Sequence, residues 1–187
     1  MKSSRDAAIL VLVSIAFGIS LAGLARVVGL TSPLFVMVAT CDFMALIAIA
    51  RPWFVLKLPR PLQPVRAWEV RGDLYRPLGV AIFGAMLRGS PLRYLNPTVY
   101  LNNRSGDSAA VCTRMEAAEA THLWAIGLTI PYVLYVGIQN RWSALVWFMI
   151  FNVGVNVYPV LHLRWIRGRL TRVLEAKLLI RSRTRLR

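Results

Sequence analysis

Apolar residues follow one another along this chain in runs that are too long for the segments of an ordinary soluble domain. Three runs, at 7–25, 32–50 and 142–161, are long enough to span a bilayer, because a hydrocarbon core of about 30 Å needs roughly 20 apolar residues in a helix. A fourth run, at 120–138, reaches that length only by including residues of the more polar segment before it. The pattern therefore predicts an all-α integral membrane protein with about four transmembrane helices.

The segment between the second and third runs, 51–110, has a different pattern. Four of the ten prolines lie between residues 51 and 64 beside aromatic and apolar residues, which favours an extended interfacial segment. Residues 68–89 begin polar and become apolar only near their end, so we expect an interfacial or re-entrant helix in the cytoplasmic leaflet. Residues 96–107 lack periodicity and are predicted to form a loop. Since the chain has no internal repeat, we expect a single membrane domain over 1–187.

Composition agrees with a membrane protein, and the charge distribution predicts its orientation. The chain is 57% hydrophobic, has a mean hydropathy of +0.54 and carries a formal net charge of +15. Basic residues are concentrated in the segment 51–110 and in the tail 164–187, whereas the two short loops between spans contain only Arg26 and Arg141. By the positive-inside rule, both termini and the segment 51–110 are cytoplasmic.

The strong positive charge raises the question of a nucleic-acid partner. The basic residues flank membrane spans and lack an interleaved aromatic platform, so we expect no nucleic acid. Anionic lipid headgroups account for the charge, since each basic residue near the surface contributes about 1 kcal/mol. The first apolar run follows Lys2 and Arg5 as a secretion signal would, but it is longer than the apolar part of a signal and is expected to be retained.

The segment 114–124 (RMEAAEATHLW) carries Glu116, Glu119 and His122 at three-residue spacing, which places them on one face of a helix. One interpretation is a solvated face just outside the membrane. A second is a carboxylate-bridged dimetal site, but such sites need two Glu-x-x-His copies and this chain has one, so no metal is expected. A third is a general base, with a neutral His122 taking a hydroxyl proton while Glu119 or Glu116 orients its ring.

Three further polar residues lie inside predicted spans. Asp42 is near the middle of the second run, where a carboxylate is costly and indicates either function or a buried partner. Its structural interpretation is a protonated or hydrogen-bonded aspartate that faces Asn152 or Asn156. These two asparagines share a face of the last span through their four-residue spacing, which suits interhelical hydrogen bonding. The sequence leaves the role of Asp42 open.

Three polar blocks occur in one order between residues 68 and 175. Their members are Trp68, Glu69, Gly72 and Tyr75; Glu119 and His122; and Asn156, Arg164, Trp165, Arg167, Arg169 and Leu170. In this order and spacing the chain resembles the glycosyl-4,4'-diaponeurosporenoate acyltransferase family, membrane enzymes that acylate a glycosylated carotenoid in staphyloxanthin-type pathways. It departs from the family pattern at Phe83 and Gly84, where a tryptophan–lysine pair is usual. It also departs at Leu163, which replaces a polar residue and lies next to His162.

The resemblance implies transfer of an acyl group from a cytoplasmic thioester to a hydroxyl of a glycosylated carotenoid or another membrane lipid. It implies no cofactor apart from the acyl thioester as co-substrate, and a place in the bacterial inner membrane. It also implies His122 as the base, Glu119 as the residue that orients it, and Glu69 as a second acid or hydroxyl binder. Candidates for substrate binding are Glu116, Asn156, Arg164, Arg167 and Arg169.

Two interpretations compete with this one. The arginines suit bidentate phosphate contacts, but they are equally explained as the positive collar of the last span. The whole chain is alternatively a non-catalytic membrane subunit that binds pigment or lipid within a photosynthetic or respiratory complex. A small transporter is less favoured, because the sequence lacks the paired broken helices typical of that class.

Overall fold

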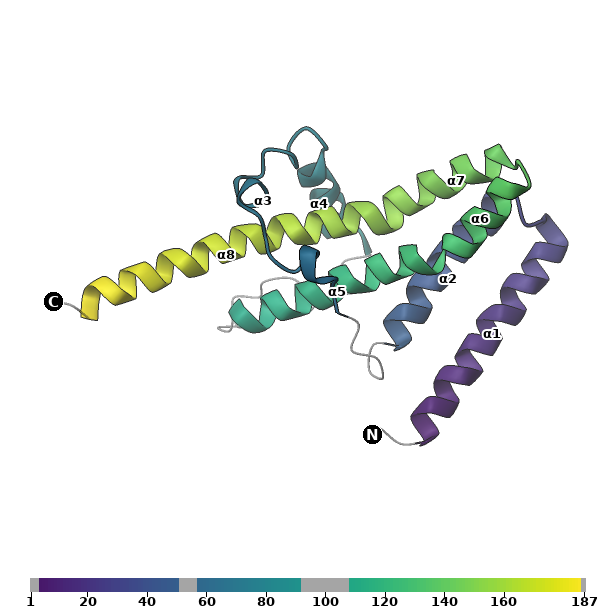
Figure 1. Ribbon diagram of the computed structural model, residues 1–187, viewed down its shortest axis with the longest axis horizontal. Coiled ribbons are helices and arrows are strands. Elements are labelled where there is room, and N and C mark those ends of the chain that lie inside the picture. The colour runs from purple at the N-terminus through teal and green to yellow at the C-terminus, as the bar shows by residue number, and fades with distance from the viewer. Residues whose placement is uncertain (1–3, 51–56, 92–107, 186–187) are drawn as a thin grey trace. The chain divides into compact units, whose positions relative to one another are not determined.

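The helices of the chain can be followed in Figure 1. A computed structural model describes residues 4–50, 57–91 and 108–185 of the 187. These residues form helices and turns and contain no strand, so the predicted all-α class is confirmed. The elements are α1 (Ser4–Val28), α2 (Pro33–Ala50), a short 3-10 turn (Arg60–Leu62), α3 (Ala67–Arg71), α4 (Val80–Gly89), α5 (Ser108–Leu128), α6 (Ile130–Ile138), α7 (Trp142–Asn152), a π-helical turn (Val153–Val157) and α8 (Tyr158–Arg185).

Four helical segments of the described residues are long and apolar enough to cross a membrane, which indicates a membrane protein and agrees with the predicted number. They are Ala7–Val28, Pro33–Ala50, Ala109–Ile138 and Trp142–Ala176. The third is longer than the expected 120–138 because α5 runs through its polar first half and continues, after a turn at Thr129, into α6. The fourth extends beyond 161 because leucine, arginine and alanine, which favour helix, continue α8.

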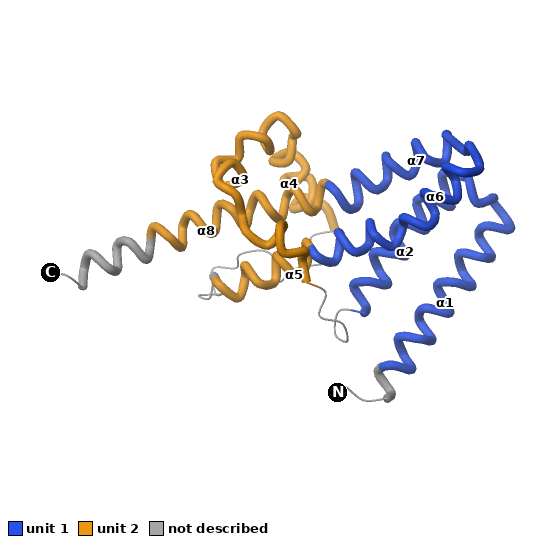
Figure 2. Tube along the Cα trace, in the orientation of Figure 1, with its two compact units in different colours: residues 1–56, 120–157 blue, residues 57–119, 158–187 orange. Residues whose placement is uncertain are grey.

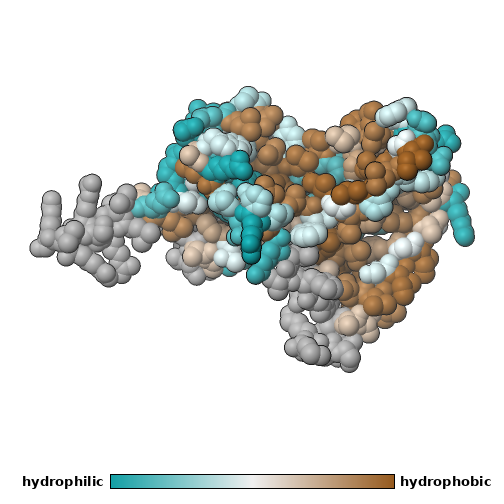
Figure 3. Space-filling model, viewed as in Figure 1, coloured by the Kyte–Doolittle hydropathy of each residue, from teal (hydrophilic) through white to brown (hydrophobic). Residues whose placement is uncertain are grey.

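The described chain forms two compact units, which Figure 2 shows in blue and orange. The first unit contains α1, α2, the second part of α5, α6, α7 and the π-helical turn. Within it α1 packs on α2, and α7 packs on both α2 and α6. The apolar side chains exposed along α1 are Ile9, Leu12, Ile15, Ile19 and Val27. Figure 3 shows brown, apolar surface over this unit. Such a surface is suited to lipid.

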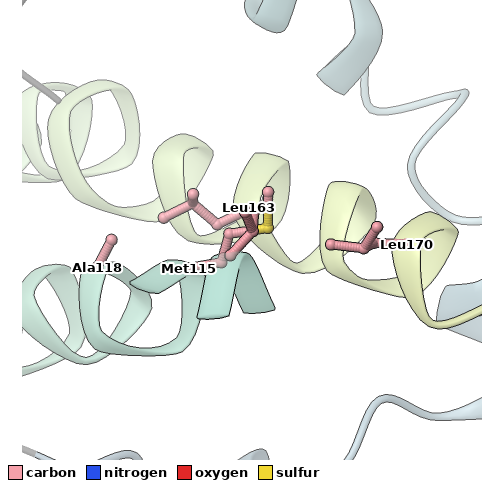
Figure 4. Packing of buried hydrophobic residues seen from close by; sticks show 5 residues of the cluster. Met115, Ala118, Leu163 and Leu170 are labelled. Carbon is pink, nitrogen blue, oxygen red and sulfur yellow. The ribbon is translucent and has the colours of Figure 1, made fainter. Parts of the chain in front are cut away.

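The second unit contains α3, α4, the first part of α5 and α8, with α3 and α4 packed on α8. Its apolar core lies between α5 and α8, as Figure 4 shows. The core residues are Val111, Met115, Ala118, Leu163 and Leu170. The α5 members recur at spacings of three and four residues, so they form one stripe of that helix.

The helix predicted over residues 68–89 is wrong in its extent. Helix α3 ends at Gly72, whose φ of 80° is left-handed, and α4 begins only after Gly79, whose φ is 67°. Glycine adopts these angles at little cost, and Pro77 between them lacks a backbone N–H, so the intervening residues form turns. The apolar end of the segment is the helix α4, which has ten residues and is too short to span.

Two other predictions fall partly or wholly outside the described residues. The loop expected over 96–107 lies outside them, as do residues 51–56 of the proline-rich segment. The described part of that segment contains the 3-10 turn Arg60–Leu62, with a proline in its first turn. The backbone carbonyls of Leu62 and Pro64 point to α8 and take part in the site described next.

Candidate functional site

Four charged side chains are buried together in the second unit, and we call them the charged cluster. They are Glu69 of α3, Glu119 of α5, and Arg164 and Arg167 of α8, none more than 8% exposed. Two acids and two arginines cancel in charge, which lowers the cost of removing them from water. Glu119 is fully buried (0%), so the interpretation of its helix face as merely solvated is wrong at this residue.

Arg164 directs all of its N–H groups at protein acceptors. Nε donates to Glu69 Oε1 at 2.5 Å and Nη2 donates to Glu69 Oε2 at 2.8 Å, which makes a bidentate pair. Nη1 donates to the Leu62 carbonyl at 2.6 Å and to Glu119 Oε2 at 3.4 Å. Nη2 also donates to the Pro64 carbonyl at 3.2 Å. Because a guanidinium has five N–H donors, Arg164 ties α3, α5 and the segment before α3 to α8.

Glu69 accepts from four donors. Besides the two bonds from Arg164, its Oε2 accepts from the Arg66 backbone N–H at 2.7 Å and its Oε1 from the Tyr75 hydroxyl at 3.0 Å. The Arg66 bond is the acidic half of a capping box at the start of α3. Burial raises the pKa of the Glu69 carboxyl, but the bonds and charge of Arg164, with those from Arg66 and Tyr75, bring that pKa below its usual value. Glu69 is therefore held as an anion.

Tyr75 completes this side of the charged cluster. Its side chain is buried, and its ring lies against Trp68 with the ring centroids 6.1 Å apart. Burial raises the pKa of the Tyr75 hydroxyl, and the charge of Glu69 and the hydrogen bond to it raise that pKa further. The hydroxyl therefore stays protonated and acts as a donor to Glu69.

Glu119 is paired with the second arginine of the cluster. Arg167 Nη2 donates to Glu119 Oε2 at 3.0 Å. Arg167 Nε lies 3.0 Å from Glu119 Oε1 as an ion pair, and neither of these two buried atoms has a hydrogen-bond partner within the described part of the chain. Glu116, which is half-buried, places Oε2 3.7 Å from Arg167 Nη1. The acidic residues of α5 thus face arginines of α8.

His122 belongs to the first unit and contacts an asparagine. Its Nδ1 lies 3.2 Å from Oδ1 of Asn156, and Nδ2 of Asn156 donates to Oδ1 of Asn152 at 2.8 Å. Both asparagines are buried, Asn156 completely, whereas the histidine ring is half-buried. Asn152 and Asn156 therefore bond to one another and to His122, rather than to Asp42, which is half-buried on α2. The prediction that Glu119 orients His122 stays a prediction.

The second histidine, His162 of α8, was not among the site residues predicted from the sequence. It is 2% exposed, and neither ring nitrogen has a hydrogen-bond partner among the described residues. Its ring lies against Gly84 of α4, with the Phe83 ring edge-on and the Trp165 ring tilted at a centroid distance of 6.4 Å. Gly84, where the chain departs from the family pattern, thus contacts His162.

The remaining predicted site residue, Arg169, is exposed. Its guanidinium carbon lies 5.4 Å from the centroid of the Trp165 ring, a cation–π contact. All four residues of the charged cluster were predicted from the sequence as site residues. His122 and Asn156, which lie together in the first unit, were predicted as well. Among the described residues, no group of three His, Cys, Asp or Glu side chains is arranged to hold a metal ion.

Comparison with known proteins identifies one family. A profile described as glycosyl-4,4'-diaponeurosporenoate acyltransferase matches residues 52–176, which is more than half of the chain. The matched range includes every residue of the charged cluster, together with His122 and both asparagines. No curated protein and no solved structure matches the chain.

Proposed function

The chain belongs to the glycosyl-4,4'-diaponeurosporenoate acyltransferase family, and on that premise we propose that it transfers an acyl group to a sugar hydroxyl of a glycosylated carotenoid or of another membrane lipid. The acyl donor in this proposal is a thioester on the cytoplasmic side. The observation that carries the proposal is the family match over residues 52–176. Four apolar helices support it, because they would keep the protein in the same bilayer as a lipid acceptor.

The chemistry assigned to His122 is general base catalysis. The acceptor oxygen attacks the acyl carbonyl carbon while its proton passes to Nε2 of His122. The carbon–sulfur bond then breaks, and the imidazolium returns that proton to the leaving thiolate. An alcohol and a thioester give an ester and a thiol, so the step balances without another reactant. Positioned proton transfer of this kind contributes about 10²- to 10⁴-fold to a rate.

The charged cluster has a supporting part in this proposal. It joins the segment before α3, α3 itself and α5 to α8 through Arg164 and Arg167. Glu119 is three residues before His122 on α5, so anything that fixes the axial rotation of α5 at Glu119 also sets the direction of the histidine. Arg169 is the exposed arginine of the motif and is proposed to contact an anionic part of the donor or a lipid headgroup.

The test is mass spectrometry of pigments and lipids from three strains, which carry the wild-type gene, the His122→Ala gene or a deletion. We expect an acylated glycolipid or carotenoid glycoside to be present in the first strain and to be lost from the other two. The histidine variant must accumulate to the wild-type level in the membrane. A matched control is Gln139→Ala, an exposed polar residue in the turn after α6, which should leave the profile unchanged.

An unchanged lipid profile in all three strains would contradict the proposal. The alternative of a non-catalytic subunit would then gain support if other membrane subunits copurified after gentle solubilisation. Loss of the product in the deletion strain alone would keep the acyltransferase and remove His122 from its chemistry.

A further inference from the structure

We propose that Asn152 and Asn156 act as a positioning pair that holds His122 in the tautomer with its proton on Nδ1 and its lone pair on Nε2. This inference rests on the proposed function, because the tautomer matters for acyl transfer only if His122 is the base. On this inference Asn156 orients the His122 ring and does not bind substrate, and Asn152 has a role in the site that was not predicted from the sequence.

An unusual backbone segment presents Asn156. Residues Val153–Val157 form a π-helical turn between α7 and α8. Such turns are rare and are frequently found at functional sites. Pro159 is the second residue after this turn and cannot donate a backbone hydrogen bond, which gives a local reason for the altered turn. The π turn carries Asn156 into the interior of the first unit, where its side chain is completely buried.

The direction of the hydrogen bonds sets the tautomer of His122. Asn156 uses its Nδ2 to donate to Asn152 Oδ1 at 2.8 Å, which leaves its Oδ1 directed at the histidine. An amide oxygen only accepts hydrogen bonds. At 3.2 Å from that oxygen, Nδ1 of His122 must therefore be the protonated nitrogen. In the neutral ring the lone pair is then on Nε2, which is the nitrogen that a base needs.

An amide suits this place better than a carboxylate would. His122 and both asparagines lie within helices that are candidate membrane spans, where an additional charge is expensive. A neutral amide orients the ring without adding charge, and in the structure Asn156 Nδ2 donates to Asn152 Oδ1, so Oδ1 of Asn156 is the end that faces the ring. The carboxylate of Glu119 is already paired with arginines.

The test reads the tautomer directly by ¹⁵N NMR of protein labelled only at histidine, in lipid nanodiscs and alkaline buffer. The chain has two histidines, so the spectrum of His122→Ala contains His162 alone and assigns the other signals. We expect wild-type His122 to show a protonated Nδ1 and an unprotonated Nε2. In Asn156→Ala, and in Asn152→Ala if the first variant does not fold, we expect a mixture of both tautomers. Asn140→Gly removes an exposed amide at a φ of 53° and should leave the spectrum unchanged.

Activity provides a second, independent measurement. Asn156→Ala should lower kcat about 10- to 100-fold, the size of effect found when a metal-binding histidine loses the partner that orients its ring. The KM for the lipid acceptor should stay within about twofold, since on this inference Asn156 does not bind substrate. A wild-type His122 with its proton on Nε2, or an unchanged tautomer in Asn156→Ala, would overturn the inference. Full acyl transfer by His122→Ala would instead overturn the proposed base, whatever the spectrum shows.

Discussion

At the scale of single residues, Arg164 is the side chain on which the charged cluster depends most. Its replacement in Arg164→Met leaves Glu69 buried without its bidentate partner, and removing one partner of a buried pair costs about 3–5 kcal/mol. Denaturant unfolding in detergent micelles measures this loss. The exposed Arg169→Met is the control and should cost no more than about 1 kcal/mol. Equal decreases in the free energy of unfolding for the two variants would mean that Arg164 does not stabilise the fold more than an exposed arginine does.

Glu69 gives the cluster a pH dependence with a definite sign. Because the folded-state pKa of Glu69 lies below its unfolded value of about 4.3, its contribution to stability is present above that unfolded value. The contribution is lost as pH falls through the lower folded pKa. The difference in melting temperature between wild type and Glu69→Gln should therefore shrink under acid. Asp73→Asn, at an exposed pair with Arg71, should show little such difference. A melting-temperature difference between wild type and Glu69→Gln that stays constant with pH would contradict the lowered pKa of Glu69.

The residues of the site were predictable where spacing or family pattern identified them, and less so where only packing did. Glu119 and His122 followed from their three-residue spacing, and Arg164 and Glu69 from the order of motifs. The sequence could not predict that every N–H group of Arg164 donates to a protein acceptor. Two of those acceptors are backbone carbonyls of a proline-rich segment. Such contacts depend on how closely the backbone of that segment approaches α8 in the folded protein, and residue type alone does not determine this.

At the scale of helices, the close approach of α4 to α8 rests on Gly84. A Cβ added there would lie 2.7 Å from Nδ1 of His162, so Gly84→Ala must displace a buried ring. Overpacking of this kind typically costs about 1–3 kcal/mol. Gly89 of the same helix has open space around it, and Gly89→Ala should be neutral or stabilising by up to about 1 kcal/mol. Unfolding of both variants in detergent measures the contrast, and equal stability would exclude a tight α4–α8 contact at Gly84.

Helix positions were predictable from hydrophobic runs, whereas their ends were not. Apolar length alone located α1 and α2 to within a few residues. The break between α3 and α4 was missed, because Gly72 and Gly79 act through backbone angles that a hydropathy pattern does not contain. The π-helical turn before Pro159 was missed for a related reason. A proline in a helical pattern predicts an irregularity of the helix, but whether this is a kink or a π-helical turn depends on which backbone hydrogen bonds the adjacent residues form.

At the scale of the whole molecule, four spans put the turns at the ends of the first and third spans on the same side of the membrane. In the first unit the Tyr132 hydroxyl donates to the Leu30 carbonyl at 2.9 Å, which links α6 to the turn after α1. We propose that this side is external, because basic residues are concentrated in the other segments. Both turns should then react with reagents that cannot cross the membrane, and the segment that contains α3 and α4 should not.

Cysteine labelling in intact cells tests this orientation. With Cys41 and Cys112 replaced by serine, Leu30→Cys and Gln139→Cys introduce thiols at exposed positions of the two turns. We expect an impermeant maleimide to label both before permeabilisation. Asp73→Cys, exposed in the second unit, should react only afterwards, because crossing the hydrocarbon core is costly for a charged reagent. Labelling of Asp73→Cys in intact cells would reverse the orientation, and labelling of one turn alone would contradict the four-span topology.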